Sequence, residues 1–132
     1  MAGELILIIE DNENNRILVR DVLQSRGYRT EETDNAEEGL RLARASQPAL
    51  ILMDIQLPGM NGMDALRLLR ADPATREIPA MAVTASAMTH DRQKIMAAGF
   101  DAYQTKPLNV REFVEAVRTV LRTHERPGST GA

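Results

Sequence analysis

Short apolar runs alternate along the chain with longer stretches in which apolar residues recur at helical spacing. Residues 5–9 form an uninterrupted aliphatic run, and residues 50–53 repeat it. Such runs are typical of central strands in a parallel sheet, which helices cover on both faces. Residues 80–83 and 102–105 are shorter candidates, and the more polar residues 28–33 suit a strand at the edge of the sheet. The pattern therefore predicts five strands.

Two of the intervening stretches end at a glycine. Residues 14–26 stop at Gly27, and residues 89–98 stop at Gly99. Glycine suits the left-handed conformation that closes many helices. We therefore predict two amphipathic helices that end just before these glycines.

The remaining helices are predicted from their starts or from their apolar faces. Asn35 precedes Glu38 by three residues, and Asn109 precedes Glu112 by three residues. Both pairs approximate a capping box with Asn in place of Ser or Thr, so a helix should follow each asparagine. We expect one more helix at about residues 63–71, where leucines recur on one face.

Five β-α units in succession predict an α/β fold, (βα)5. Its commonest compact form is a doubly wound, flavodoxin-like three-layer sandwich with a five-stranded parallel sheet in the order 2-1-3-4-5. Because crossovers between parallel strands are right-handed, the carboxyl ends of all strands lie at one edge, where ligands bind. We expect one domain over residues 1–125. A flexible tail should follow over residues 126–132, where the sequence becomes small and polar.

Composition narrows the range of functions. The chain has 132 residues, a net charge of −3 and no cysteine. Disulfides, thiolate metal sites and a cysteine nucleophile are therefore excluded. No basic block indicates nucleic-acid binding, and the first apolar run is far too short to span a membrane. We expect a cytoplasmic protein with no nucleic-acid or membrane partner.

Polar residues stand where four of the predicted strands end. Glu10 and Asp11 follow the first strand, Asp54 the third, Thr84 the fourth and Lys106 the fifth. Each alone has an ordinary explanation as a helix cap, a strand end or a solvated turn residue. Because neighbouring strands lie close together, all five residues would instead surround one cleft with three carboxylates, a hydroxyl and an ammonium.

Such a cleft favours one kind of chemistry. Close carboxylates repel one another, so they favour either protonation or a hard divalent cation such as Mg²⁺. Beside Mg²⁺ a carboxylate can attack phosphorus, while a lysine and a hydroxyl hold the phosphoryl oxygens. We expect Asp54 to be the nucleophile, because it follows the most apolar central strand between the acidic pair and Thr84.

Four segments carry a family resemblance: IIEDNENN, LILMDIQLPGMNG, AVTASAM and TKP. In type, order and spacing they resemble the signature segments of two-component response regulator receiver (CheY-like) domains, through residues 4–123. Within that family the chain resembles single-domain cell-cycle regulators of the DivK kind. The resemblance implies a phosphorelay protein that takes a phosphoryl group from a sensor histidine kinase or a histidine phosphotransfer protein. Such a domain catalyses its own phosphorylation and dephosphorylation and is not a turnover enzyme.

The resemblance also implies roles for single residues around the metal. Asp54 would be the phospho-acceptor and, with Asp11, a direct Mg²⁺ ligand. Glu10, in place of the commoner aspartate, would act on the metal through water, and the backbone carbonyl of Gln56 would be a further ligand. Gln56 and Ser86 are both near enough to reach an attacking water, so they are predicted to tune the lifetime of the phosphorylated state.

A second group of implied roles concerns the phosphoryl oxygens and the response to them. Thr84 would bond one oxygen and Lys106 would pair with another, and the peptide bond from Lys106 to Pro107 would be cis. As a switch, the Thr84 hydroxyl would move toward the phosphate and the ring of Tyr103 would turn inward behind it. That change would alter the surface of the fourth helix, last strand and last helix, to which a downstream protein would bind. The alternative for Tyr103 is an ordinary amphipathic tyrosine.

Three other hypotheses stay open. A phosphohydrolase of the aspartyl-phosphate type also uses a strand-end Asp with Mg²⁺, but it usually has a second aspartate where this chain has Gln56. A flavodoxin-like cofactor-binding module is disfavoured by the acidic turn DNENN, which would repel a nucleotide phosphate. The chain could also be a receiver domain excised from a hybrid histidine kinase or a longer regulator.

Overall fold

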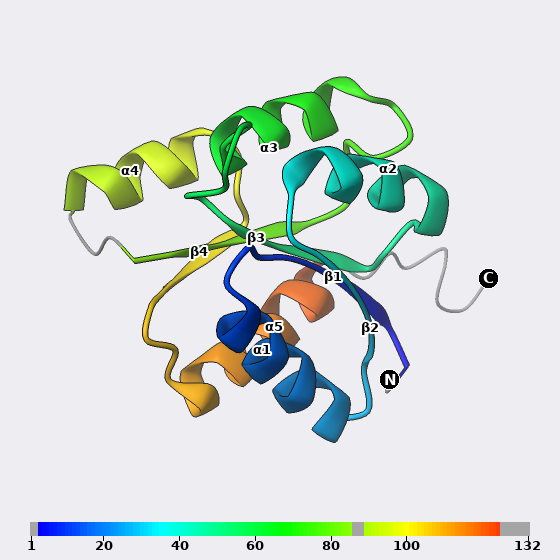
Figure 1. The fold of residues 1–132 in the computed structure, drawn as a ribbon, viewed down its shortest axis with the longest axis vertical. Coiled ribbons are helices and arrows are strands. Elements are labelled where there is room, and N and C mark those ends of the chain that lie inside the picture. The colour runs from blue at the N-terminus through cyan, green and yellow to red at the C-terminus, as the bar shows by residue number, and fades with distance from the viewer. Residues whose placement is uncertain (1–2, 86–88, 125–132) are drawn as a thin grey trace.

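A computed structural model describes residues 3–85 and 89–124 of the chain, and strands and helices alternate throughout them. The strands are β1 (Leu5–Ile9), β2 (Arg29–Thr33), β3 (Leu50–Asp54), β4 (Ala80–Thr84) and β5 (Ala102–Thr105). The helices are α1 (Glu13–Ser25), α2 (Ala36–Ser46), α3 (Gly62–Ala71), α4 (Thr89–Ala97) and α5 (Val110–Thr123). In Figure 1 the sheet lies between α2, α3 and α4 on one face and α1 and α5 on the other.

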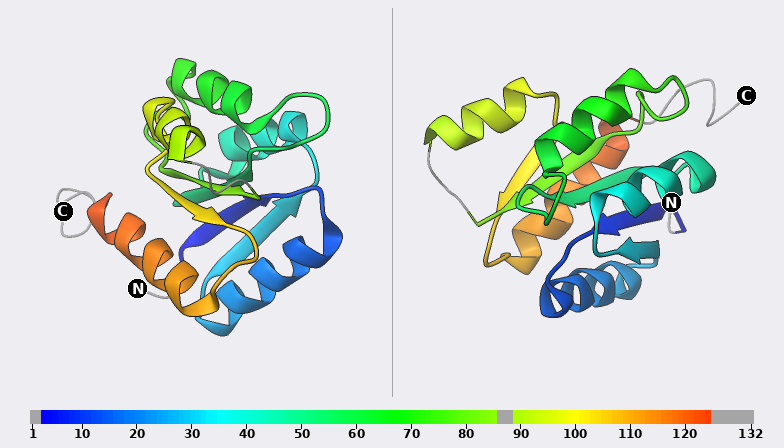
Figure 2. Two further views of the ribbon diagram at one scale, coloured as in Figure 1. Left: turned by 90° about the vertical axis from the view of Figure 1, so that its left-hand side faces the viewer. Right: turned by 45° about the horizontal axis from the view of Figure 1, so that its top comes forward.

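The five strands form one parallel sheet in the order β2-β1-β3-β4-β5. This is the doubly wound arrangement predicted from the alternating pattern, and the polar strand β2 lies at an edge as expected. The two further views in Figure 2 show the same three layers. The order places β1, β3, β4 and β5 next to one another, so their carboxyl ends share one stretch of the sheet edge.

The core consists of two apolar clusters, one on each face of the sheet. Along β1, Ile6 and Ile8 pack with buried residues of α1 and α5, whereas Leu7 and Ile9 pack with residues of α2, α3 and α4. Successive strand residues point to opposite faces, so a strand covered on both faces needs apolar residues at every position. This explains why β1 and β3 are uninterrupted aliphatic runs.

The predicted helix ends are mostly confirmed. Gly27 and Gly99 have φ angles of 92° and 113°, in the left-handed region that favours glycine. The side chain of Asn35 accepts a hydrogen bond from the backbone N–H of Glu38. Asn109 caps α5 in the same way. These two asparagine caps therefore determine where α2 and α5 begin.

Several element boundaries differ by one residue from the predicted ones. Helix α1 ends at Ser25 and not at residue 26, α4 ends at Ala97 and not at residue 98, and β2 begins at Arg29 and not at residue 28. Helix α1 begins at Glu13 and not at residue 14, because Asn12 is its N-cap and accepts from the N–H of Asn15. Strands β3 and β4 each continue one residue further, to Asp54 and Thr84. The apolar pattern ends there, but the backbone pairing does not. Both functional candidates are thus the last residues of buried strands.

Some predictions concern parts of the chain that the structure does not describe. Ser86 and residues 126–132 lie outside the described residues, so the tail and the domain boundary at residue 125 stay predictions. Within residues 3–85 and 89–124, no helix combines the length and the apolar character needed to cross a membrane.

Candidate functional site

The strand register brings the predicted polar residues to one place. Asp54 of β3 lies opposite Val83 of β4, one residue before Thr84. Thr84 lies opposite Thr105 of β5, which is followed by Lys106. On the other side of β3, β1 ends just before Glu10. The parallel topology thus gathers residues from four distant segments at the same edge of the sheet.

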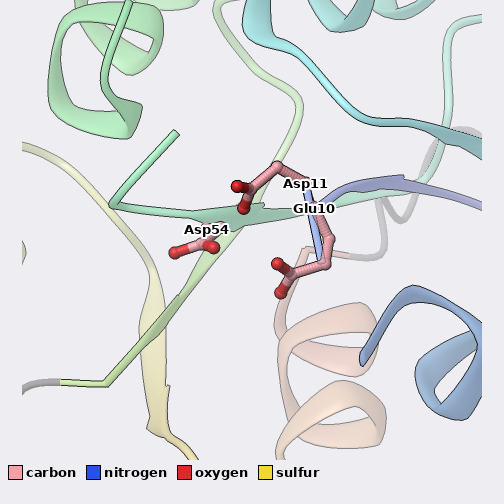
Figure 3. A group of neighbouring side chains, drawn as sticks. All are labelled: Glu10, Asp11 and Asp54. Atoms are coloured by element: carbon pink, nitrogen blue, oxygen red, sulfur yellow. The ribbon is translucent and has the colours of Figure 1, made fainter. Parts of the chain in front are cut away.

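Three carboxylates converge at this edge, as Figure 3 shows. One carboxylate oxygen from each of Glu10, Asp11 and Asp54 lies within 4.8 Å of the other two. Glu10 and Asp54 are each only 4% exposed, whereas Asp11 is exposed to solvent. Two carboxylates buried so deeply need strong polar partners, since burial removes the water that stabilises their charge.

Lys106 supplies part of that compensation. Its Nζ donates to Oδ2 of Asp54 at 3.0 Å and lies 2.9 Å from Oε1 of Glu10. Burial alone would lower the pKa of the Lys106 ammonium, but its hydrogen bonds to Glu10 and Asp54 outweigh this and raise the pKa. Burial also raises the pKa of Glu10, although Lys106 acts in the opposite direction. The peptide bond from Lys106 to Pro107 is cis.

Backbone groups fix the orientation of the two buried carboxylates. The N–H of Gln56 donates to Oδ1 of Asp54 at 2.9 Å, and the N–H of Asn12 donates to Oε2 of Glu10 at 3.0 Å. From α1, the Nη1 group of Arg16 donates to the backbone carbonyl of Glu10 at 2.8 Å. Neither Asn12 nor Arg16 is among the predicted site residues, because these contacts depend on how closely α1 approaches the end of β1.

A close approach of α3 to the end of β3 also belongs to the site. A Cβ atom at Gly62 would lie 2.6 Å from the backbone oxygen of Asp54 and 2.9 Å from the Cα of Ile55. The N–H of Gly62 donates to the carbonyl of Ile55 at 2.9 Å. The main chain that carries Asp54 therefore rests directly against the first residue of α3, and glycine is the residue that permits this contact.

Thr84 and Tyr103 lie on the same face of the sheet. Tyr103 is opposite Ala82, two residues before Thr84, and side chains two residues apart in a strand share a face. Thr84 is 2% exposed, while Tyr103 is half-buried against the cluster on the α2, α3 and α4 side. The side chain of Gln56 is exposed. Thr84 and Tyr103, the two switch candidates, thus lie in the neighbouring strands β4 and β5, and β4 is paired with the strand that carries Asp54.

Comparison with known proteins identifies the family. Residues 6–118 match the response regulator receiver domain family. The chain belongs to this family. The polar-differentiation response regulator DivK of Brucella anthropi is 45% identical over 116 residues, which cover 88% of this chain and 94% of that protein. This receiver domain is thus closely related to single-domain DivK regulators, as expected from its motifs, and its function lies in two-component signalling.

Solved structures agree with this assignment. The receiver domain of a sensor histidine kinase from Pseudomonas aeruginosa PAO1, with a magnesium ion coordinated in its active site cleft, is 33% identical with a TM-score of 0.84. The match covers 92% of this chain and 99% of that domain. The chemotaxis response regulator CheY4 of Vibrio cholerae is 23% identical with a TM-score of 0.84, and the match covers 90% of this chain and 99% of that protein. The latter shows the shared CheY-like fold.

The residues of the receiver site fit a magnesium ion. Glu10, Asp11 and Asp54 offer hard oxygen ligands of the type that Mg²⁺ prefers, and the side chain of Asp11 is exposed to solvent. The sequence left two other kinds of protein open, a phosphohydrolase and a flavodoxin-like module that binds a cofactor. The family match favours a receiver domain over both.

Proposed function

We propose that Asp54 of this receiver domain accepts a phosphoryl group from the phosphohistidine of a sensor histidine kinase or a histidine phosphotransfer protein. One observation carries the proposal: a nearly buried Asp54 carboxylate, oriented by a backbone N–H, lies within reach of two further carboxylates and of the Lys106 ammonium. Such a set of groups suits the transfer of a highly charged phosphoryl group.

The chemical step exchanges one bond for another. An oxygen of Asp54 forms a bond to phosphorus while the phosphorus–nitrogen bond of the donor breaks, and the bonding electron pair stays on the imidazole nitrogen. Asp11 and Asp54 would hold Mg²⁺ directly, Glu10 through water and Gln56 through its backbone carbonyl. When bound, the ion would supply positive charge for the phosphoryl oxygens. The backbone N–H of Gln56 keeps the Asp54 carboxylate aimed out of the strand end.

Lys106 and Thr84 would receive the transferred group. Lys106 now contacts Asp54 and Glu10, so its ammonium has to move by only a short distance to pair with a phosphoryl oxygen. The hydroxyl of Thr84 would bond another oxygen, and Tyr103 would turn inward behind it. We infer that this movement changes the surface formed by α4, β5 and α5, and that a downstream protein binds this α4-β5-α5 face.

The phosphorylated state would then be lost slowly by hydrolysis, in which water attacks the phosphoryl group and returns Asp54 to a carboxylate. We propose that Gln56 and Ser86 tune this rate. The domain would thus catalyse its own phosphorylation and dephosphorylation as a signalling protein. The cytoplasm is the compartment we propose for it, since a cysteine-free chain suits a reducing compartment.

The central proposal is tested by incubation with acetyl phosphate and Mg²⁺, followed by intact-mass measurement. The wild-type chain should gain the mass of one phosphoryl group, and Asp54→Asn should gain none. Asp21→Asn is the matched control, because Asp21 is an exposed aspartate of α1 that pairs with Arg20. Absence of an adduct on the wild type, under conditions where Mg²⁺ is shown to bind, would refute the proposal.

A further inference from the structure

We propose that Arg92 of α4 is a positioning residue for the switch: its guanidinium holds the ring of Tyr103 in the arrangement of the unphosphorylated domain and so opposes switching. The inference rests on the proposed function, because it takes Thr84 and Tyr103 as the groups that respond to phosphorylation. It adds a residue of α4 to that response, with a defined direction of effect.

The observation is a cation–π contact between a helix and a strand. Cζ of Arg92 lies 5.3 Å from the centroid of the Tyr103 ring. This distance is within the range of about 6 Å over which a guanidinium is attracted to the face of an aromatic ring. The contact joins α4 to β5, two of the elements that form the proposed partner-binding face.

Helix α4 has few other anchors among its described side chains. From residue 92 to residue 97, only Ile95 is buried, and the other side chains are exposed. A helix with so little apolar burial is held weakly against the sheet, since burial of an apolar face supplies most of the stability of such a helix. Besides the buried Ile95, the contact from Arg92 to Tyr103 is therefore a second link between the described part of α4 and the sheet.

The direction of the effect follows from burial. Arg92 is exposed, whereas Thr84 is 2% exposed and shares a face of the sheet with Tyr103. A ring that turns from the half-buried position toward Thr84 moves inward, away from the exposed guanidinium. The cation–π contact is then made in one state and lost in the other, which is the condition for a contact to shift a two-state equilibrium.

The size of the shift follows from the strength of such contacts. An exposed cation–π pair changes an equilibrium by a factor of about two to five. By linkage, a ligand that favours the switched state has to overcome the same factor. Removing the guanidinium should therefore tighten the binding of a phosphoryl mimic by about two- to fivefold.

The chain allows the ring to be observed on its own. It contains two tyrosines and no tryptophan, so Tyr28→Phe leaves Tyr103 as the single tyrosine. In this background we would titrate beryllofluoride, a phosphoryl mimic, in the presence of Mg²⁺ and follow the NMR signals of the labelled Tyr103 ring. The variants are Arg92→Gln, Arg92→Lys and, as matched control, Lys94→Gln, which removes a positive charge from the same helix.

The expected result is specific to Arg92. Arg92→Gln should move the free-state signals of Tyr103 toward their bound positions and tighten beryllofluoride binding by about two- to fivefold. Arg92→Lys should lie between Arg92→Gln and the parent protein, because a lysine keeps a weaker cation–π contact. Lys94→Gln should behave as the parent protein.

Two results would overturn the inference in different ways. If the parent protein responds to beryllofluoride but Arg92→Gln and Lys94→Gln behave alike, or Arg92→Gln binds more weakly, Arg92 does not restrain the ring and only this inference fails. If beryllofluoride binds and the Tyr103 signals of the parent protein do not move, the proposed switch itself is wrong, and the role of Arg92 is refuted with it.

Discussion

Substitution of Gly62 by alanine would test whether the contact between α3 and β3 positions Asp54, the proposed phospho-acceptor. The added Cβ would lie 2.6 Å from the backbone oxygen of Asp54, closer than the 3.0 Å below which such contacts are essentially never observed. Both of the nearest atoms belong to the main chain of β3 and the residue after it, so no side chain can rotate out of the way. Helix α3 and the segment that carries Asp54 must therefore move apart by at least about 0.4 Å.

The expected cost combines two opposing terms. Overpacking a well-packed region costs about 1–3 kcal/mol. Alanine recovers at most about 1 kcal/mol through its helix preference, and less at the first position of a helix. We therefore expect the free energy of unfolding to fall by about 1–2 kcal/mol. Since even small misplacements of reacting groups slow a reaction, phosphorylation by acetyl phosphate should slow by about tenfold.

Gly39→Ala is the matched control for Gly62→Ala. Its added Cβ would lie 2.8 Å from Cγ1 of Ile9 and closer still to Cδ1, atoms of a side chain that can change rotamer. Urea denaturation should show a smaller loss of stability in Gly39→Ala, because Ile9 can change rotamer and alanine is favoured inside α2, and the phosphorylation rate, followed by intact mass, should fall only in Gly62→Ala. A Gly62→Ala protein that is phosphorylated at the wild-type rate would show that the helix contact does not position Asp54.

Three further predictions concern two charged side chains of the site and the neutral amide of Gln56. Asp11→Asn should raise the free energy of unfolding of the metal-free protein by about 0.5–1 kcal/mol, because it removes one of three close negative charges. It should also abolish the rise in melting temperature that Mg²⁺ causes, and an undiminished rise would contradict the proposed role of Asp11 as a metal ligand. Lys106→Ala should lower the free energy of unfolding by about 2–4 kcal/mol, because Glu10 and Asp54 then stay buried without their ammonium partner. Calorimetry should also show tighter Mg²⁺ binding, and weaker binding would contradict the idea that Lys106 and the metal compete for these carboxylates. Gln56→Ala should change the rate at which the phosphoryl adduct decays without preventing its formation, whereas an unchanged decay would exclude its tuning role.

The fold was predictable because its central strands β1, β3 and β4 are covered on both faces. Ile6 to Ile9 have to be apolar at every position, since they alternate between the two core clusters. The glycines and asparagines at helix ends act locally, so their effect could also be inferred from the sequence. The predicted strands end one residue before Asp54 and Thr84, whereas the observed strands include both residues. The pattern of apolar residues shows which side chains are buried, but strand pairing depends on backbone hydrogen bonds, which polar residues can also form.

The site was predictable only as far as topology determines it. Once parallel strands are inferred, their polar ends must meet, which identifies Glu10, Asp54, Thr84 and Lys106. The contacts of Arg16 and Gly62 depend on how closely α1 and α3 approach the sheet, and sequence spacing does not contain that information.

The charge of the site connects these observations. Lys106 is predicted to pair with a phosphoryl oxygen, and without one its ammonium contacts Glu10 and Asp54. Three carboxylates and one ammonium leave two negative charges, which is the charge that one divalent cation balances. Once a cation is bound, it balances the charge of the carboxylates. An incoming phosphoryl group brings further negative charge, so the Lys106 ammonium then interacts more favourably with the phosphoryl group than with the carboxylates. We therefore expect that Lys106 changes partners because of charge balance when a phosphoryl group is transferred, and that metal binding precedes phosphorylation.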